Sequence, residues 1–185
     1  MAALVPRYTA QEIRHFPDDR LRYEVIRGEL FVTPAPGTAH QRAVRDLCLR
    51  LQEYLKAHAL GEALPAPFEV QFAEDTAVQP DVIVVLQAQR PRLSAERLTG
   101  APALAIEVVS FSSKRTDRLQ KRQLYQEEGV AEYWVVDTTE QRVERWRPAD
   151  AEPEVVTRVL AWRPTTAVAP FELDLRDFFA AIRAG

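Results

Sequence analysis

The sequence predicts an α/β fold, and three features of its hydrophobic pattern lead to this interpretation. Continuous apolar runs at 82–86, 104–109 and 133–136 are typical of strands that are buried on both faces of a sheet. Between the last two runs, residues 116–128 have a helical composition, and Gly129 follows them as a stop signal. The order strand, helix, strand favours a crossover connection, which would make the two strands parallel.

The N-terminal part predicts a short helix followed by a hairpin. Thr9 and Glu12 have the spacing of a capping box, so a helix is expected from about Thr9 to a residue before Pro17. Residues 22–32 alternate between apolar and polar side chains on either side of the Arg-Gly pair at 27–28, as in a β-hairpin.

A long amphipathic helix is predicted next. Apolar side chains at 44–55 recur with the i, i+3, i+4, i+7 spacing of one helix face, and Thr38 with Gln41 forms a second capping box. A helix of about 20 residues would span about 30 Å, and Gly61 is placed to end it. His40 would lie in its first turn.

The rest of the chain adds an outer strand and a peripheral C-terminal part. Residues 68–72 alternate as in a half-buried strand, while 143–147 and 155–162 predict peripheral strands before a final helix near 175–183. Since no repeat, low-complexity tract or second domain is visible, we expect residues 1–185 to form one domain.

Composition excludes several classes of protein. Cys48 is the single cysteine, so no intramolecular disulfide is expected, and the three histidines lie too far apart in sequence to indicate a zinc cluster. The sequence has neither a signal peptide pattern nor the roughly 20 consecutive apolar residues of a membrane span. A soluble, cytoplasmic protein without membrane contact is therefore expected.

The formal net charge of -3 excludes binding of nucleic acid by overall attraction, so any such binding must be local. Asparagine is absent, which favours a thermophilic source, but the scarcity of lysine does not fit the usual pattern of hyperthermophiles. A GC-rich genome is the other interpretation of the arginine-rich composition.

Two carboxylates lie where the pattern predicts buried strands. Asp81 follows Pro80 at the head of the run 82–86, and Glu107 interrupts the run 104–109. A buried carboxylate is costly unless it is paired or binds a cation, and hard oxygen ligands suit Mg²⁺. The alternative is that each residue caps a strand or pairs with an arginine.

Lys121 is the candidate for a third site residue. It lies on the same predicted helix face as Leu124, so its ammonium group is expected to reach the sheet. An ordinary surface pair with Asp117, worth about 0.3 to 0.5 kcal/mol, is the alternative. Lys114, in the preceding loop, is the rival cation.

Three further residues are weaker candidates. His40 at a helix N-terminus could help to hold an anion or a metal-bound water, although a solvated histidine is common there. Glu24 and Glu29, on the two arms of the hairpin, would add a metal ligand only if the hairpin folds over the site.

The segments YEVIRGEL, PAPGTAHQ, QPDVIVV, IEVVSFSSKRTDRLQKRQLY and GVAEYWVVD together resemble the Uma-two family of restriction-endonuclease-like proteins, over about 9–137. That family is assigned to the PD-(D/E)XK nuclease superfamily. The resemblance implies a restriction-endonuclease-like fold, a mixed central sheet flanked by helices.

The resemblance also implies site roles. Asp81 matches the first acid and Glu107 the second, and both would bind Mg²⁺ or Mn²⁺. The superfamily lysine is expected at position 109, which is Val109 here, so Lys121 on the next helix is carried over as the catalytic cation. A homodimer is expected by analogy with nucleases that cut two strands.

The leading hypothesis is therefore a metal-dependent endonuclease that hydrolyses phosphodiester bonds in DNA. One alternative is a catalytically inactive module of the same fold that binds nucleic acid or a protein partner. Another is a hydrolase of small phosphate esters. Acids neutralised by arginine would favour the inactive module, and a basic groove beside an intact acid pair would favour the enzyme.

Overall fold

The structure, a computed structural model, describes residues 7–109 and 115–184, without the side chains of residues 115–118. Within these residues the centre is a six-stranded mixed sheet with the order β11-β10-β9-β8-β6-β3. Its strands are β3 (Gly61–Pro65), β6 (Val82–Leu86), β8 (Leu104–Val109), β9 (Glu132–Asp137), β10 (Arg142–Trp146) and β11 (Glu154–Val156).

Strands β8 and β9 are parallel and are joined through helix α3 (Arg115–Glu127), which confirms the predicted crossover. The other neighbouring pairs of this sheet are antiparallel. The sheet is therefore mixed, as the sequence interpretation required.

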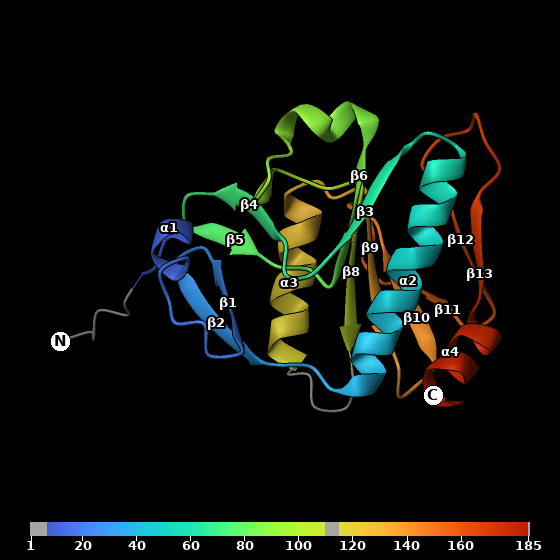
Figure 1. Cartoon of the computed structure of the whole chain (residues 1–185), viewed down its shortest axis with the longest axis horizontal. Coiled ribbons are helices and arrows are strands. Elements are labelled where there is room, and N and C mark those ends of the chain that lie inside the picture. The colour runs from blue at the N-terminus through green and yellow to red at the C-terminus, as the bar shows by residue number, and fades with distance from the viewer. Residues whose placement is uncertain (1–6, 110–114, 185) are drawn as a thin grey trace.

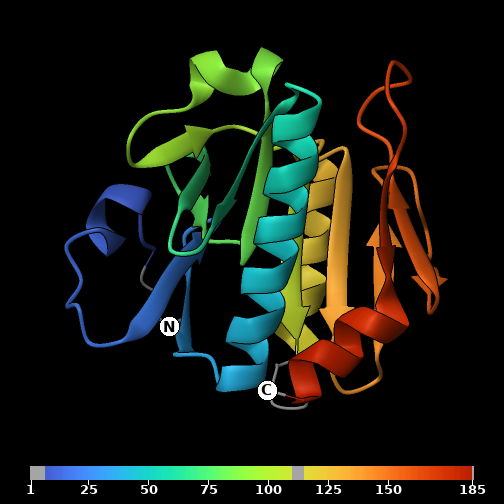
Figure 2. The same ribbon diagram turned by 45° about the vertical axis from the view of Figure 1, so that its right-hand side comes forward.

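Helices cover both faces of the central sheet (Figures 1 and 2). Val82 and Val84 of β6 pack in the core beneath α2 (Thr38–Ala57) and α4 (Leu175–Ala184), whereas Ile83 and Val85 pack in the core beneath α3. This alternation follows from the two-residue period of a strand. Side chains of one strand can therefore meet α2 or α3, depending on their parity.

A second sheet lies beside the first, on the N-terminal side of the molecule in Figure 1. In the described part of the chain it has five strands in the order β2-β1-β5-β4-β7. Their bounds are β1 (Leu21–Ile26), β2 (Glu29–Pro34), β4 (Glu69–Ala73), β5 (Thr76–Val78) and β7 (Arg97–Thr99). Ile26, Val70, Val78 and Leu98 share one core with Ile83 of the central sheet, so the two sheets are packed together.

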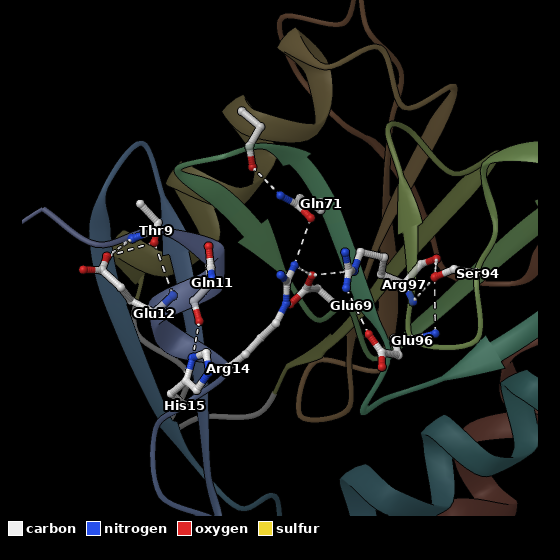
Figure 3. A network of polar contacts seen from close by, with 11 residues as sticks. Thr9, Gln11, Glu12, Arg14, His15, Glu69, Gln71, Ser94, Glu96 and Arg97 are labelled. Atoms are coloured by element: carbon white, nitrogen blue, oxygen red, sulfur yellow. Dashed lines mark hydrogen bonds and ion pairs between the residues drawn. The ribbon is translucent and has the colours of Figure 1, made fainter.

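Helix α1 (Ala10–Ile13) begins with the capping box that the sequence predicts, between Thr9 and Glu12. Arg14, directly after α1, pairs with Glu69 and donates to Gln71 of β4 at 2.9 Å, as Figure 3 shows. These contacts attach the N-terminal helix to the second sheet.

The C-terminal part is an antiparallel pair, β12 (Val159–Trp162) and β13 (Phe171–Asp174), which leads directly into α4. A short 3₁₀ helix, η1 (Gln87–Arg92), follows β6. The segment 155–162 contributes to two strands, β11 of the central sheet and β12 of the C-terminal pair. Among the described residues, no helix combines the length and apolarity that crossing a membrane requires.

Two predictions at the ends of α2 were wrong. The N-cap is Gly37, without a side-chain cap, and Thr38 is already the first helical residue, so Thr38 and Gln41 form no capping box. The helix ends at Ala57, and Ala59 rather than Gly61 adopts the left-handed conformation, with φ of 51°.

Gly61 instead opens β3, a strand that the sequence analysis missed. A Cβ atom at Gly61 would lie 2.1 Å from the carbonyl oxygen of Val85. The glycine therefore permits the close approach of β3 to β6, and its φ of +157° is one that other residues rarely adopt.

We expect Leu47→Ala in α2 to lower the free energy of unfolding by about 2 to 5 kcal/mol, because Leu47 is fully buried beneath α4 and the sheet. Leu49→Ala is the matched control, since Leu49 is 56% exposed on the same helix and should change stability by about 0.5 kcal/mol or less. Urea denaturation of both variants measures the difference. Equal effects would contradict the packing of α2 described above.

Candidate active site

Asp81 lies immediately before β6 and is 2% exposed. Its Oδ1 accepts a hydrogen bond from Arg22 Nη1 at 2.9 Å, and its Oδ2 lies 3.0 Å from His40 Nε2 and accepts from the amide of Val108 at 2.8 Å. Burial alone would raise the pKa of Asp81, but His40, Arg22 and the Val108 amide together lower it below the usual value. Asp81 is therefore ionised at neutral pH.

Glu107 lies in β8, and the strand alternation directs it to the α3 side of the sheet. Its Oε1 accepts from Lys121 Nζ at 2.8 Å and from the hydroxyl of Tyr125 at 3.0 Å. Burial, with the charges of Asp81 and Glu24, raises the pKa of Glu107 to about 7, although Lys121 acts in the opposite direction. Glu107 therefore binds a proton more readily than Asp81.

Lys121 of α3 connects the two sheets. Its ammonium group lies 2.8 Å from Glu107 of the central sheet and 2.9 Å from Glu24 of β1. Burial would lower the pKa of Lys121, but these two carboxylates raise it above the usual value. Lys121 thus faces the sheet as predicted, and it stays protonated.

Glu24 and His40 both lie beside these residues, Glu24 in contact with Lys121 and His40 in contact with Asp81. Glu24 Oε1 accepts from the amide of Gln79 at 2.7 Å and from Lys121, so it holds the lysine. His40 lies in the first turn of α2, and its Nδ1 is buried without a hydrogen-bond partner among the described residues.

The remaining sequence candidates lie elsewhere. Glu29 is exposed at the start of β2, where its Oε2 accepts from Gln120 at 3.4 Å, and the structure does not bring it to the carboxylate cluster. Lys114 and the side chain of Asp117 lie outside the described residues.

Sequence reasoning missed two residues that contact the acids, Arg22 and Tyr125. For each of them, the spacing from a candidate site residue indicates that it lies on the same face. Arg22 lies two residues before Glu24 and so points to the same face of β1, and Tyr125 lies four residues after Lys121 on the same face of α3. We define the carboxylate cluster as Asp81, Glu107 and Glu24 with Arg22 and Lys121.

The two oxygens of each acid differ in the number of hydrogen bonds that they accept, and this difference bears on metal binding. A carboxylate oxygen has two lone-pair sites. Oδ2 of Asp81 and Oε1 of Glu107 each have two donors, whereas Oδ1 of Asp81 has one donor, and Oε2 of Glu107 has none from the described residues. Counting donors from the described residues, each acid therefore keeps one oxygen with capacity for a cation.

The charges of the cluster also favour the binding of a cation. As defined, the cluster contains three carboxylates and two cations, Arg22 and Lys121. No group of three or more His, Cys, Asp or Glu side chains suited to a metal occurs in the described ranges. Mg²⁺, however, is commonly held by one or two carboxylates with water and substrate phosphate, so Asp81 and Glu107 fit it.

Comparison with known proteins agrees with the fold. Residues 10–176 match the family described as "Uma2: Putative restriction endonuclease". The chain belongs to the Uma2 family. Among curated proteins, no sequence matches this chain.

A solved structure similar to this Uma2 chain is that of a "putative nuclease belonging to DUF820" from Anabaena variabilis. The TM-score is 0.79 at 22% sequence identity, and the match covers 95% of this chain and 99% of the other. This likeness shows that the two chains share a fold.

We expect metal-free wild type to lose stability relative to Glu107→Gln as the pH rises from about 4.5 to 7.5. The pKa of Glu107 is about 7 in the folded state and about 4.3 in the unfolded state, so the folded protein binds the extra proton between these values. The stabilising contribution is complete below the unfolded value and is lost as the pH passes the folded one, a change of about 1 to 3 kcal/mol.

Urea denaturation in the presence of a chelator, at several pH values, measures this difference. Groups that titrate alike in both proteins cancel in the subtraction. A difference that does not vary with pH, or that favours wild type as the pH rises, would contradict the environment assigned to Glu107.

Proposed function

We propose that this chain is a metal-dependent endonuclease that hydrolyses phosphodiester bonds in DNA. One observation carries the proposal: Asp81 and Glu107, from different segments, lie in one cluster with Lys121, and in the described part of the chain each acid keeps an oxygen with capacity for a cation. Membership of the family described as "Putative restriction endonuclease" and the likeness to the chain described as a "putative nuclease" support it.

In this proposal Asp81 and Glu107 would hold Mg²⁺ or Mn²⁺. A bound divalent ion would supply a water of lowered pKa and would neutralise phosphate charge. Asp81 is ready for this role because its pKa is low, while Glu107 must release its proton, which happens near neutral pH.

Lys121 contributes as a hydrogen-bond donor and a positive charge. Because two carboxylates raise its pKa, Lys121 is not a general base at neutral pH. Its ammonium group is fixed beside Glu107 and would stabilise the negative charge that develops on the phosphate.

A second function, an inactive module that binds nucleic acid or protein, is favoured by one observation. Arg22 and His40 already bind Asp81, and neutralisation of an acid by arginine is the arrangement expected of such a module. Against it, Glu107 has no arginine partner among the described residues, and its ion pair there is with Lys121.

Wild type should bind Mn²⁺, and Asp81→Asn and Glu107→Gln should each weaken binding by more than about tenfold, because loss of a ligand exceeds the usual effect of losing its supporting contact. Isothermal titration calorimetry measures the dissociation constants. Asp46→Asn is the control, since Asp46 pairs with Arg50 on α2. Equal affinities for wild type and all three variants would show that the acids are structural.

Lys121→Gln should lower the rate of DNA cleavage with Mg²⁺ or Mn²⁺ by about 10² to 10³-fold, as expected for loss of one charge-stabilising donor. Mn²⁺ affinity should not fall, because both ligands remain. Lys56→Gln, a change of an exposed lysine on α2, is the matched control. Cleavage by Lys121→Gln at the wild-type rate would remove Lys121 from the mechanism.

A further inference from the structure

Arg22 lies among all three carboxylates of the cluster. Its guanidinium is close enough to Asp81, Glu107 and Glu24 for each to raise the pKa of Arg22, against the effect of burial. Its one direct ion pair among the described residues is with Asp81, at 2.9 Å. Arg22 therefore occupies the region to which the proposed function assigns a divalent cation.

The contacts of Arg22 show which oxygen of Asp81 the guanidinium and a divalent cation would share. Nη1 donates both of its hydrogens, to Asp81 Oδ1 at 2.9 Å and to the carbonyl oxygen of Gln79 at 3.0 Å. The other oxygen of Asp81 already has two donors, His40 and Val108. A cation bound by Asp81 must therefore use Oδ1, the oxygen that Arg22 also holds.

The rest of the guanidinium has capacity for a second partner. Nε and Nη2 carry three hydrogens, and neither atom has a partner among the described residues. The side chain is 20% exposed, more than any carboxylate of the cluster, so it reaches toward solvent. A planar guanidinium with two free nitrogen atoms matches the oxygens of a phosphate group.

We propose that Arg22 neutralises Asp81 while the site has no metal and binds the phosphate of the nucleic acid strand once a divalent cation shares Oδ1. This inference rests on the proposed function and deepens it by naming the group that holds the substrate phosphate. Arg22 then has opposite effects on the two binding events: its charge weakens metal binding and strengthens substrate binding.

The test compares Arg22→Gln with wild type in two measurements. Calorimetry with Mn²⁺ alone should show tighter binding by Arg22→Gln, by about tenfold, because a competing positive charge is removed. Single-turnover cleavage of duplex DNA at saturating Mn²⁺ should be slower by at least about tenfold, because the phosphate loses its guanidinium.

Two further variants separate charge from geometry. Arg22→Lys keeps the positive charge but not the planar fork, so its Mn²⁺ affinity should equal that of wild type while its cleavage is slower. It also provides the test if Arg22→Gln does not fold. Arg45→Gln removes an exposed arginine of α2 that has no contact with the cluster among the described residues, and its Mn²⁺ affinity should be unchanged.

The outcomes distinguish this inference from the proposed function. If wild type binds Mn²⁺ and Arg22→Gln binds it no more tightly, Arg22 does not compete for Oδ1 and the inference is overturned alone. Tighter Mn²⁺ binding with unchanged cleavage would overturn the phosphate role. A wild type that binds no Mn²⁺ would overturn the proposed function together with the inference.

Discussion

The structure depends on the burial of three carboxylates at the junction of its two larger sheets. Glu24 comes from β1, Asp81 from the segment before β6 and Glu107 from β8. Buried charges of one sign are strongly unfavourable unless they are paired and hydrogen bonded. Lys121 meets this requirement across the junction, because one ammonium group binds a carboxylate from each sheet. The packing of the second sheet against the central sheet thus also assembles the site.

Arg22 and Lys121 alone do not match the three carboxylates of the cluster, and the proposed function uses this difference. His40 is a further partner of Asp81, at 3.0 Å. Glu107 relieves the excess by holding a proton up to about pH 7, and a divalent cation would relieve it instead. Val108 donates to Oδ2 of Asp81, and Tyr125 donates to Oε1 of Glu107, which fixes both carboxylate groups. The other oxygen of each acid, which would bind the cation, is therefore positioned before the cation arrives.

Much of the central sheet could be predicted because its signals are local. The apolar run around Glu107 and the helix after it require only strand and helix periods, and these place Glu107 and Lys121 on facing surfaces. Glu24 and Arg22 could not be placed in this way. Their contacts with Lys121 and Asp81 join residues far apart in the chain and exist only because the second sheet packs beside α3. The prediction that Gly61 ends the helix was wrong, because a glycine is needed there for the close approach of the β3 and β6 backbones and not for a turn.

The most direct test of this account is a crystal structure of the protein grown with Mn²⁺, with the ion located by its anomalous scattering. The account predicts one strong peak within about 2.3 Å of Asp81 Oδ1 and Glu107 Oε2, with ordered water completing the shell. Lys121 should remain on Glu107 Oε1. The absence of a peak between the two acids at saturating Mn²⁺, with Arg22 still alone on Oδ1, would contradict the account and identify the cluster as a structural ion-pair network.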